Sequence, residues 1–154
     1  MDIIIKRPFE LSEKEIYQII DLIESGSQIQ GIRETINRRL RNAVLISFIL
    51  DNDKIVATAT LKNPAETYQK KVFKEAESDA DITTYKYELG YIVTASSREG
   101  EKLCQKLLAV FFPKIAAYKM FATTRKAEMV HILGKYGFSR TGIIYNLNLC
   151  LLVN

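Results

Sequence analysis

The sequence has few of the residues on which several classes of site depend. Its 154 residues include one histidine, two cysteines and no tryptophan. Cys104 and Cys150 cannot build a disulfide framework, and without a cluster of cysteines and histidines we expect no metal site. The longest apolar run, Leu107 to Phe112, is far shorter than the ~18 residues that span a bilayer. Because a basic leader is absent too, we expect a cytoplasmic protein with no membrane partner.

Glycine and proline are also scarce, with 7 and 3 residues. Together with 47% hydrophobic and 26% charged residues, this composition excludes disordered, collagen-like and repeat chains. A length of 154 residues corresponds to one domain, so we expect residues 1–154 to fold as a single unit.

Charge is distributed unevenly along the chain. Residues 1–95 carry 13 basic and 15 acidic side chains, whereas residues 96–154 carry 9 basic and 3 acidic ones. The basic C-terminal part is suited to an anion, which leaves open a phosphate-bearing cofactor, a nucleic acid or a role in solubility alone.

Hydrophobic periodicity and turn residues predict twelve elements. Ser12 and Glu15 form a capping-box pattern before the first helix, and Pro113 is expected to close the long helix. The expected strands are residues 2–7, 44–50, 54–61, 84–93, 118–123, 138–141 and 143–153, and the expected helices are residues 12–25, 31–42, 65–77, 101–112 and 125–135. The order βααββαβαβαββ predicts an α/β (α+β) fold, with helices on both faces of a mixed sheet.

The segment from Tyr91 to Leu103 is the most informative part of the sequence. It predicts a strand, a loop with serine, arginine and glycine, and then the start of a helix, an arrangement that can direct free helical amides at a phosphate. The spacing fits neither the dinucleotide fingerprint nor the P-loop, because both need several glycines. From spacing alone, a plain loop remains the competing interpretation.

The block Tyr87–Val93, the segment Ser97–Leu108 and the later Lys135-Tyr136-Gly137-Phe138 together resemble the GCN5-related N-acetyltransferase (GNAT) family. The resemblance extends over nearly the whole chain in element order and implies a mostly antiparallel sheet. The family's loop has Arg or Gln, two residues, Gly, one residue, then Gly or Ala. Counted from Arg98, the two small-residue places hold Glu101 and Leu103. With one extra loop residue they hold Lys102 and Cys104 instead.

The resemblance implies acetyl-CoA as co-substrate and direct transfer to an amine in a ternary complex. The backbone of Ile92 and Val93 would meet the thioester, and an amide placed there stabilises the oxyanion. The pyrophosphate would lie on the loop and the start of the helix. These phosphate-side positions are Arg98, Glu99, Gly100, Glu101, Lys102 and Leu103.

Two side chains are the candidates for proton transfer. Glu88 lies on the strand that leads into the loop, and it could accept the amine proton directly or through water. The competing interpretation is a solvent-facing strand residue or an ion-pair partner. The family's tyrosine acid would fall on Leu133, so Tyr136 is the nearest substitute.

The acceptor and the partners stay open. Arg33, Arg38, Arg39 and Arg41 make an acidic protein, a nucleotide or a tRNA more attractive acceptors than a polyamine, although such a group is commonly a solvated helix face. The Leu-rich last strand suggests pairing with a second copy of the chain. The missing glycines and Leu133 favour an alternative, a GNAT-fold module that has lost catalysis and binds a protein or a nucleic acid.

Overall fold

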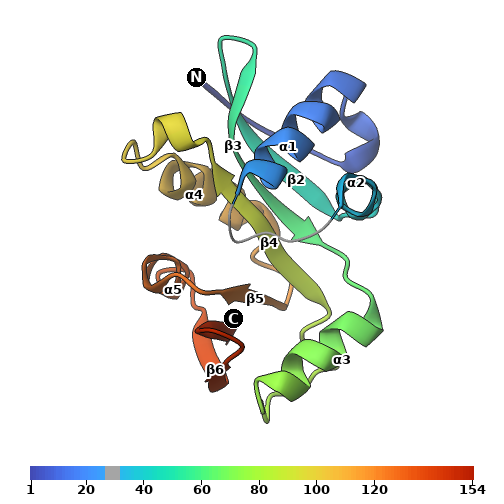
Figure 1. Cartoon of the computed structure of the whole chain (residues 1–154), viewed down its shortest axis with the longest axis vertical. Coiled ribbons are helices and arrows are strands. Elements are labelled where there is room, and N and C mark those ends of the chain that lie inside the picture. Colours follow the sequence, from blue (N-terminus) through green and yellow to red (C-terminus); the bar gives the residue numbers. More distant parts are fainter. Residues whose placement is uncertain (27–31) are drawn as a thin grey trace. The chain divides into compact units, whose positions relative to one another are not determined.

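The computed structural model describes residues 1–26 and 32–154 of the chain (Figure 1). Gly31, the first residue of the expected second helix, lies outside these residues. The elements are β1 (Asp2–Lys6), α1 (Glu13–Ser25), α2 (Arg33–Arg41), β2 (Leu45–Asp51), β3 (Lys54–Lys62), α3 (Glu66–Glu75), β4 (Tyr87–Thr94), α4 (Leu103–Ile115), β5 (Met120–Thr124), α5 (Ala127–Gly134), β6 (Ser139–Tyr145) and β7 (Leu149–Val153), with short 3-10 helices η1 (Pro8–Glu10) and η2 (Ser96–Arg98). The order βααββαβαβαββ is confirmed.

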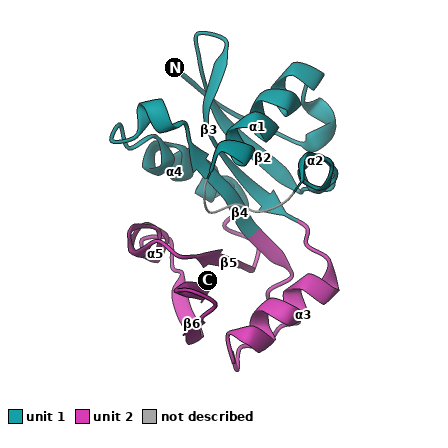
Figure 2. Ribbon diagram, viewed as in Figure 1, with its two compact units in different colours: residues 1–62, 89–115 teal, residues 63–88, 116–154 magenta. Residues whose placement is uncertain are grey.

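The chain divides into two compact units (Figure 2). Unit 1 contains Met1–Lys62 and Leu89–Ile115, and unit 2 contains Asn63–Glu88 and Ala116–Asn154. Strand β4 contributes its first two residues to unit 2 and the rest to unit 1. The single domain expected from length stays a prediction.

In unit 1 the sheet has the order β1-β2-β3-β4, with antiparallel pairing of β1 to β2 and of β2 to β3. Helices α1 and α2 pack against one face, where Ile19, Ile23 and Ile36 meet Phe48 on β2. Helix α4 packs against β1, β2 and β3 through its own apolar stripe. Residues 46–49 of β2 and 55–61 of β3 are all buried. Because successive strand residues point to opposite faces, both faces of this sheet are covered, as the sequence predicts.

Local chemistry explains where α1 begins and how it is joined to the sheet. The Ser12 hydroxyl accepts a hydrogen bond from the Glu15 amide at 3.1 Å, and the Ser12 amide donates to Glu15 Oε1 at 2.8 Å. This is the predicted capping box. Further along α1, Gln18 donates to the Asp53 carbonyl at 3.2 Å and accepts from the Ile55 amide at 2.8 Å. The β2–β3 turn is therefore fixed to α1.

In unit 2 the sheet has the order β4-β5-β7-β6. The start of β4 is parallel to β5, and β7 is antiparallel to both β5 and β6. Helix α3 supplies Val72 and Phe73 to a core that includes Phe121 and Leu151. At Gly142 an added Cβ would lie 2.0 Å from the Ala76 carbonyl oxygen, and the φ is +73°. Only glycine fits where β6 meets the end of α3.

Three expected boundaries are wrong. The last two strands meet at Asn146, Leu147 and Asn148, all at positive φ, and not at Gly142, which lies inside β6. Pro113 lies within α4, because burial of the apolar Ile115 beyond it offsets the lost hydrogen bond. β4 begins at Tyr87 and not at residue 84, because the Asp81 carboxylate accepts hydrogen bonds from Thr83 and forms a turn.

The apolar surface of the last strand is also different from the expectation. Leu151 and Leu152 are fully buried, so they offer no surface to a second copy. The exposed apolar residues here are Ile143, Ile144 and Leu147, on β6 and the turn that follows it. No helix among residues 1–26 and 32–154 has the length and apolar character that crossing a bilayer requires.

Candidate functional site

Strand β4 leads into the candidate site through an irregular backbone. Tyr91 has a φ of 51° in the middle of the strand, a value that side-chain-bearing residues rarely adopt. Its ring is buried against the α1 and α2 side of the sheet, as is Val93, whereas Ile92 is half-buried. The strand ends where the Ala95 amide donates to the Val56 carbonyl at 2.8 Å. These contacts set the direction in which the chain leaves the sheet.

We refer to residues 95–102, between β4 and α4, as the α4 loop. Gly100 has a φ of +89° with open space around it, and Lys102 has a φ of 58° immediately before α4. The first helical hydrogen bond runs from the Lys106 amide to the Lys102 carbonyl at 3.0 Å. The amides of residues 103–105 therefore precede the helical ladder, at the positive end of the helix dipole.

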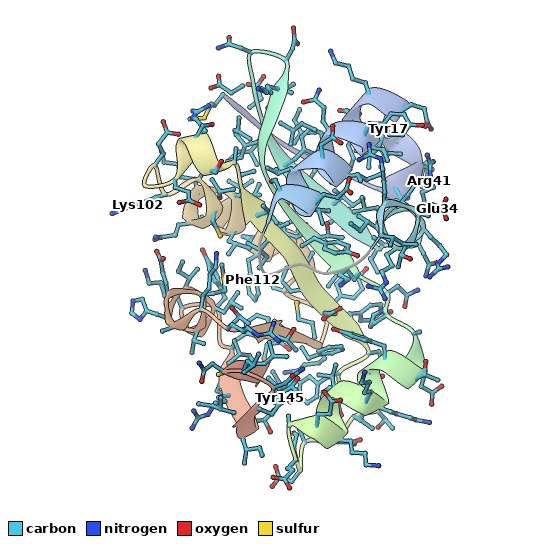
Figure 3. All side chains as sticks on the ribbon, viewed as in Figure 1. Tyr17, Glu34, Arg41, Lys102, Phe112 and Tyr145 are labelled. Carbon is cyan, nitrogen blue, oxygen red and sulfur yellow. The ribbon has the colours of Figure 1, made fainter. Side chains whose placement is uncertain are left out.

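The left-handed backbone at Lys102 decides between the two ways of aligning the loop. A residue at this φ is in a conformation that glycine adopts at little cost, and the alignment with one extra loop residue assigns Lys102 to the family's first glycine. We therefore favour that alignment, in which Lys102 has the positive φ typical of glycine although it is not a glycine. Figure 3 shows Lys102 directed outward from the loop.

Side chains of the α4 loop differ in what they can offer a ligand. Glu99, Gly100, Glu101 and Lys102 are exposed. Leu103 is 1% exposed, so its side chain belongs to the core and only its backbone amide faces the loop. The predicted phosphate-side residues thus lie together, although Leu103 can contribute only through its main chain.

Arg98 is held by two carboxylates. Its Nη1 donates to Asp51 Oδ2 at 2.8 Å, and its Nε donates to Glu101. The hydrogen bonds that Arg98 donates to Glu101 and Asp51 raise the pKa of Arg98. Since Asp51 lies at the β2–β3 turn, Arg98 joins the α4 loop to that turn. Its charge is neutralised locally, so Arg98 acts as a clamp on the loop more than as a phosphate ligand.

A hollow of about 270 Å³ lies beside the clamp. Asp51 and Lys54 line it from the β2–β3 hairpin, and Ser97 and Arg98 line it from the α4 loop. Ile55, Val56 and Ala95 supply its apolar lining. The lining of the hollow is partly polar and partly apolar, and no pattern in the sequence indicates it.

The predicted base lies in unit 2. Glu88 is 3% exposed, and its register partner on β5 is Phe121. Its Oε2 accepts a hydrogen bond of 3.0 Å from the hydroxyl of Tyr68 on α3. Glu88 is therefore not the solvent-facing strand residue of the competing interpretation.

Tyr136, the substitute for the family's tyrosine, follows α5 in the same unit. Its amide donates to the Leu133 carbonyl at 2.9 Å, and its side chain is half-buried. Leu133, where the family's tyrosine would fall, is 1% exposed and belongs to the core. The helix therefore uses that position for packing.

Two of the arginines of α2, Arg33 and Arg41, are engaged with acidic side chains of α1. Arg33 Nη1 donates to Asp21 at 2.7 Å and also to Glu24, and these two hydrogen bonds raise the pKa of Arg33. Arg41 Nη2 donates to Glu13 at 3.1 Å. This pairing removes much of the electrostatic argument for an acidic acceptor or a nucleic acid at α2.

Comparison of the structure with solved structures gives a consistent result. An acyl-CoA N-acyltransferase from Pseudomonas aeruginosa superposes with a TM-score of 0.73 at 15% identity, over 99% of this chain and 98% of that one. A GNAT-family acetyltransferase from Streptococcus agalactiae gives 0.67 at 19% identity, over 98% and 93%. The chain has the GNAT fold. A NatC complex bound to Gag peptide and CoA also matches, at 0.64 and 17% identity over 99% and 98%. Neither a family model nor a curated protein matches the sequence.

Within this GNAT fold, two residues that hold the candidate groups were missed from the sequence. Tyr68 was assigned only to the apolar face of its helix, because its spacing indicates a core position. Asp51 was assigned only to a turn. Their partners Glu88 and Arg98 lie 20 and 47 residues away, so no local pattern could have indicated either contact.

Proposed function

We propose that this protein is an acetyl-CoA-dependent N-acetyltransferase that transfers the acetyl group directly to an amine in a ternary complex. The observation that carries the proposal is the junction of β4 and α4 in a GNAT fold. There a left-handed backbone at Gly100 and Lys102 precedes three amides that lie outside the helical ladder. Such amides and the helix dipole suit a pyrophosphate.

The residues of the α4 loop fit the phosphate side of acetyl-CoA. The exposed part of the loop consists of Glu99, Gly100, Glu101 and Lys102. Leu103, which follows it, contributes its amide. Arg98 keeps the loop against the β2–β3 turn. Main-chain groups of Ile92 and Val93 are proposed to face the thioester. A fixed amide at the carbonyl oxygen stabilises a developing oxyanion by about 3–4 kcal/mol.

The proposed reaction exchanges one bond for another. The neutral amine nitrogen attacks the thioester carbonyl carbon, so that a C–N bond forms and the C–S bond breaks. Glu88 accepts a proton from the amine nitrogen, directly or through water. The sulfur leaves as a thiolate and receives a proton, for which Tyr136 remains our candidate donor. The products are the acetylated amine and free CoA.

The first experiment is calorimetric titration with acetyl-CoA and with CoA, at low and moderate salt. We expect saturable micromolar binding that depends weakly on salt, because a few amides carry it. A control for the loss of one positive charge is Lys14, an exposed lysine of α1 that lies outside the α4 loop. Lys14→Ala should bind as the wild type does. Absence of binding to either nucleotide would contradict the proposal.

The second experiment is the release of free CoA thiol with defined amines. A peptide with a free N-terminus, an amino acid amide and spermidine represent three acceptor classes. Release that depends on the amine, together with the mass of an acetylated product, would support the transferase. Release at the same rate without any amine would indicate thioester hydrolysis and count against it.

A GNAT-fold module without catalysis is the alternative, and the buried Leu133 at the tyrosine position favours it. It predicts no amine-dependent release of CoA, whether or not the protein binds CoA. A nucleic-acid function predicts affinity that falls steeply with salt. The pairing of Arg33 and Arg41 with α1 weighs against that function.

A further inference from the structure

The buried carboxylate of Glu88 has a neutral polar neighbour, the hydroxyl of Tyr68. We refer to Glu88 and Tyr68 as the Glu88 cluster; both residues lie within unit 2. The Tyr68 hydroxyl donates to Glu88 Oε2 at 3.0 Å, and Glu88 is 3% exposed. A carboxylate taken out of water needs donors in return, and a phenol hydroxyl can supply one without adding a charge.

The ring of Tyr68 is half-buried and packs against the apolar core of unit 2. Its centroid lies 6.5 Å from that of Phe121, the β5 residue in register with Glu88. The next residue, Gln69, donates to the carbonyl of Ile82 at 2.9 Å and to that of Tyr85. Helix α3 is thereby fixed to the segment that leads into β4. The hydroxyl of Tyr68 thus has a defined place relative to the Glu88 carboxylate.

We propose that Tyr68 is a positioning residue for Glu88, which fixes the carboxylate in the orientation needed to accept the amine proton. This inference rests on the proposed function, in which Glu88 is the base. Its basis is the Tyr68–Glu88 hydrogen bond together with the burial of the carboxylate. Tyr68 acts through Glu88 and takes no part in bond making.

The inference predicts an effect on kcat and none on the KM for acetyl-CoA. A base that is free to turn spends less time in a productive orientation, and small misplacements of a catalytic group cost rate steeply. Loss of the Tyr68 hydroxyl should therefore lower kcat. It should leave the KM for acetyl-CoA unchanged, since no part of the α4 loop is altered.

Tyr145 offers a matched control within the same apolar core. Its hydroxyl is buried and makes no hydrogen bond within the part of the chain that the structure describes. Tyr68→Phe and Tyr145→Phe each remove one phenol oxygen and keep the ring. Only the first removes a hydrogen bond to Glu88.

The test measures CoA release with whichever of the three defined amines gives the highest rate. The proteins are the wild type, Tyr68→Phe, Tyr145→Phe, Glu88→Gln and the double variant Tyr68→Phe/Glu88→Gln. We expect Tyr68→Phe to lower kcat about tenfold at unchanged KM for acetyl-CoA. In the Glu88→Gln background the same change should have no further effect, and Tyr145→Phe should keep the wild-type rate.

Each other result overturns the inference in a recognisable way. Multiplying effects in the double variant would mean that Tyr68 acts independently of Glu88. An equal loss in Tyr145→Phe would show a general effect of core polarity. A full rate in Glu88→Gln would remove the base while leaving acetyl transfer established. If the wild type releases no CoA with any of the amines, the proposed function itself fails.

Discussion

The α4 loop and the Glu88 cluster both contain hydrogen-bonded carboxylates, and these differ greatly in exposure. In the α4 loop, Arg98 binds Asp51 and Glu101, whose side chains remain 24% and 47% exposed. In the Glu88 cluster, the carboxylate is 3% exposed and a neutral phenol is the donor. Exposed ion pairs contribute about 0–1 kcal/mol, whereas a buried polar group left without its partner costs about 1–3 kcal/mol.

This difference indicates different tolerances to change. The α4 loop presents main-chain amides, which survive most side-chain substitutions because they belong to the backbone. The Glu88 cluster depends on one carboxylate and on the ring that holds it. We therefore expect substitutions in the loop to change binding modestly and substitutions in the cluster to change turnover strongly.

The largest effect is expected for Glu88→Gln. Removing a general base lowers turnover about 100-fold or more, while the substitution keeps the size of the side chain. Titration of acetyl-CoA should give the wild-type affinity, because the α4 loop is intact. Glu75→Gln, at an exposed position on α3, is the matched control and should keep full activity. An unchanged rate in Glu88→Gln would remove the contrast between cluster and loop.

A pair of glycine substitutions compares the rigidity of the two regions. Both glycines have positive φ, but a Cβ at Gly142 would lie 2.0 Å from the Ala76 carbonyl oxygen, whereas nothing lies within 4 Å of one at Gly100. We expect Gly142→Ala to lower the free energy of unfolding by about 3 kcal/mol, from backbone strain and overpacking together. Gly100→Ala should lose about 1 kcal/mol.

Chemical denaturation of both variants checks this prediction. Equal losses would mean that the contact between β6 and the end of α3 adjusts easily. The region around the Glu88 cluster would then be no more rigid than the loop.

Lys102 tests the loop with opposite effects on stability and binding. Lys102→Gly relieves the left-handed conformation and should raise the free energy of unfolding by about 1 kcal/mol. The loss of one exposed charge beside the proposed pyrophosphate should weaken acetyl-CoA binding severalfold at low salt and less at high salt. Lys102→Asn removes the same charge and also tolerates this φ, so it should bind similarly. Tighter binding in either variant would show that Lys102 opposes the nucleotide.

Much of the fold could be predicted because its signals are local. The Ser12–Glu15 capping box and the apolar spacing of α4 both act within a few residues, and the structure contains both helices. The β6–β7 turn was misplaced because Asn146, Leu147 and Asn148 adopt positive φ without a glycine, while the apolar alternation continues through them. A turn without its usual residues leaves little trace in the sequence.

The candidate site was predictable where it consists of backbone and unpredictable where it consists of distant side-chain pairs. The α4 loop follows from a strand, a glycine and a helix in succession. The contacts of Glu88 with Tyr68 and of Arg98 with Asp51 depend on how separate segments pack. For the same reason, the sequence could not indicate that Arg33 and Arg41 of α2 pair with acidic residues of α1.

The smallest effect concerns Tyr145 and the pH dependence of stability. Burial, with a further contribution from Glu75, raises the pKa of Tyr145 to about 12 from an ordinary value of 10. Because the folded state holds this proton more tightly than the unfolded state, the free energy of unfolding falls as the pH rises from about 10 toward 12. Tyr145→Phe should remove this part of the alkaline decline.

At neutral pH, Tyr145→Phe should also raise the free energy of unfolding by about 1 kcal/mol, since it deletes a buried hydroxyl that has no partner among the described residues. Urea unfolding of wild type and variant at pH 7 and at pH 10.5 measures both effects. Tyr68→Phe is the contrasting variant, because it breaks a hydrogen bond to Glu88 and should destabilise. If both variants destabilise equally, the hydroxyl of Tyr145 has a partner in solution, and the contrast between the hydroxyls of Tyr68 and Tyr145 is lost.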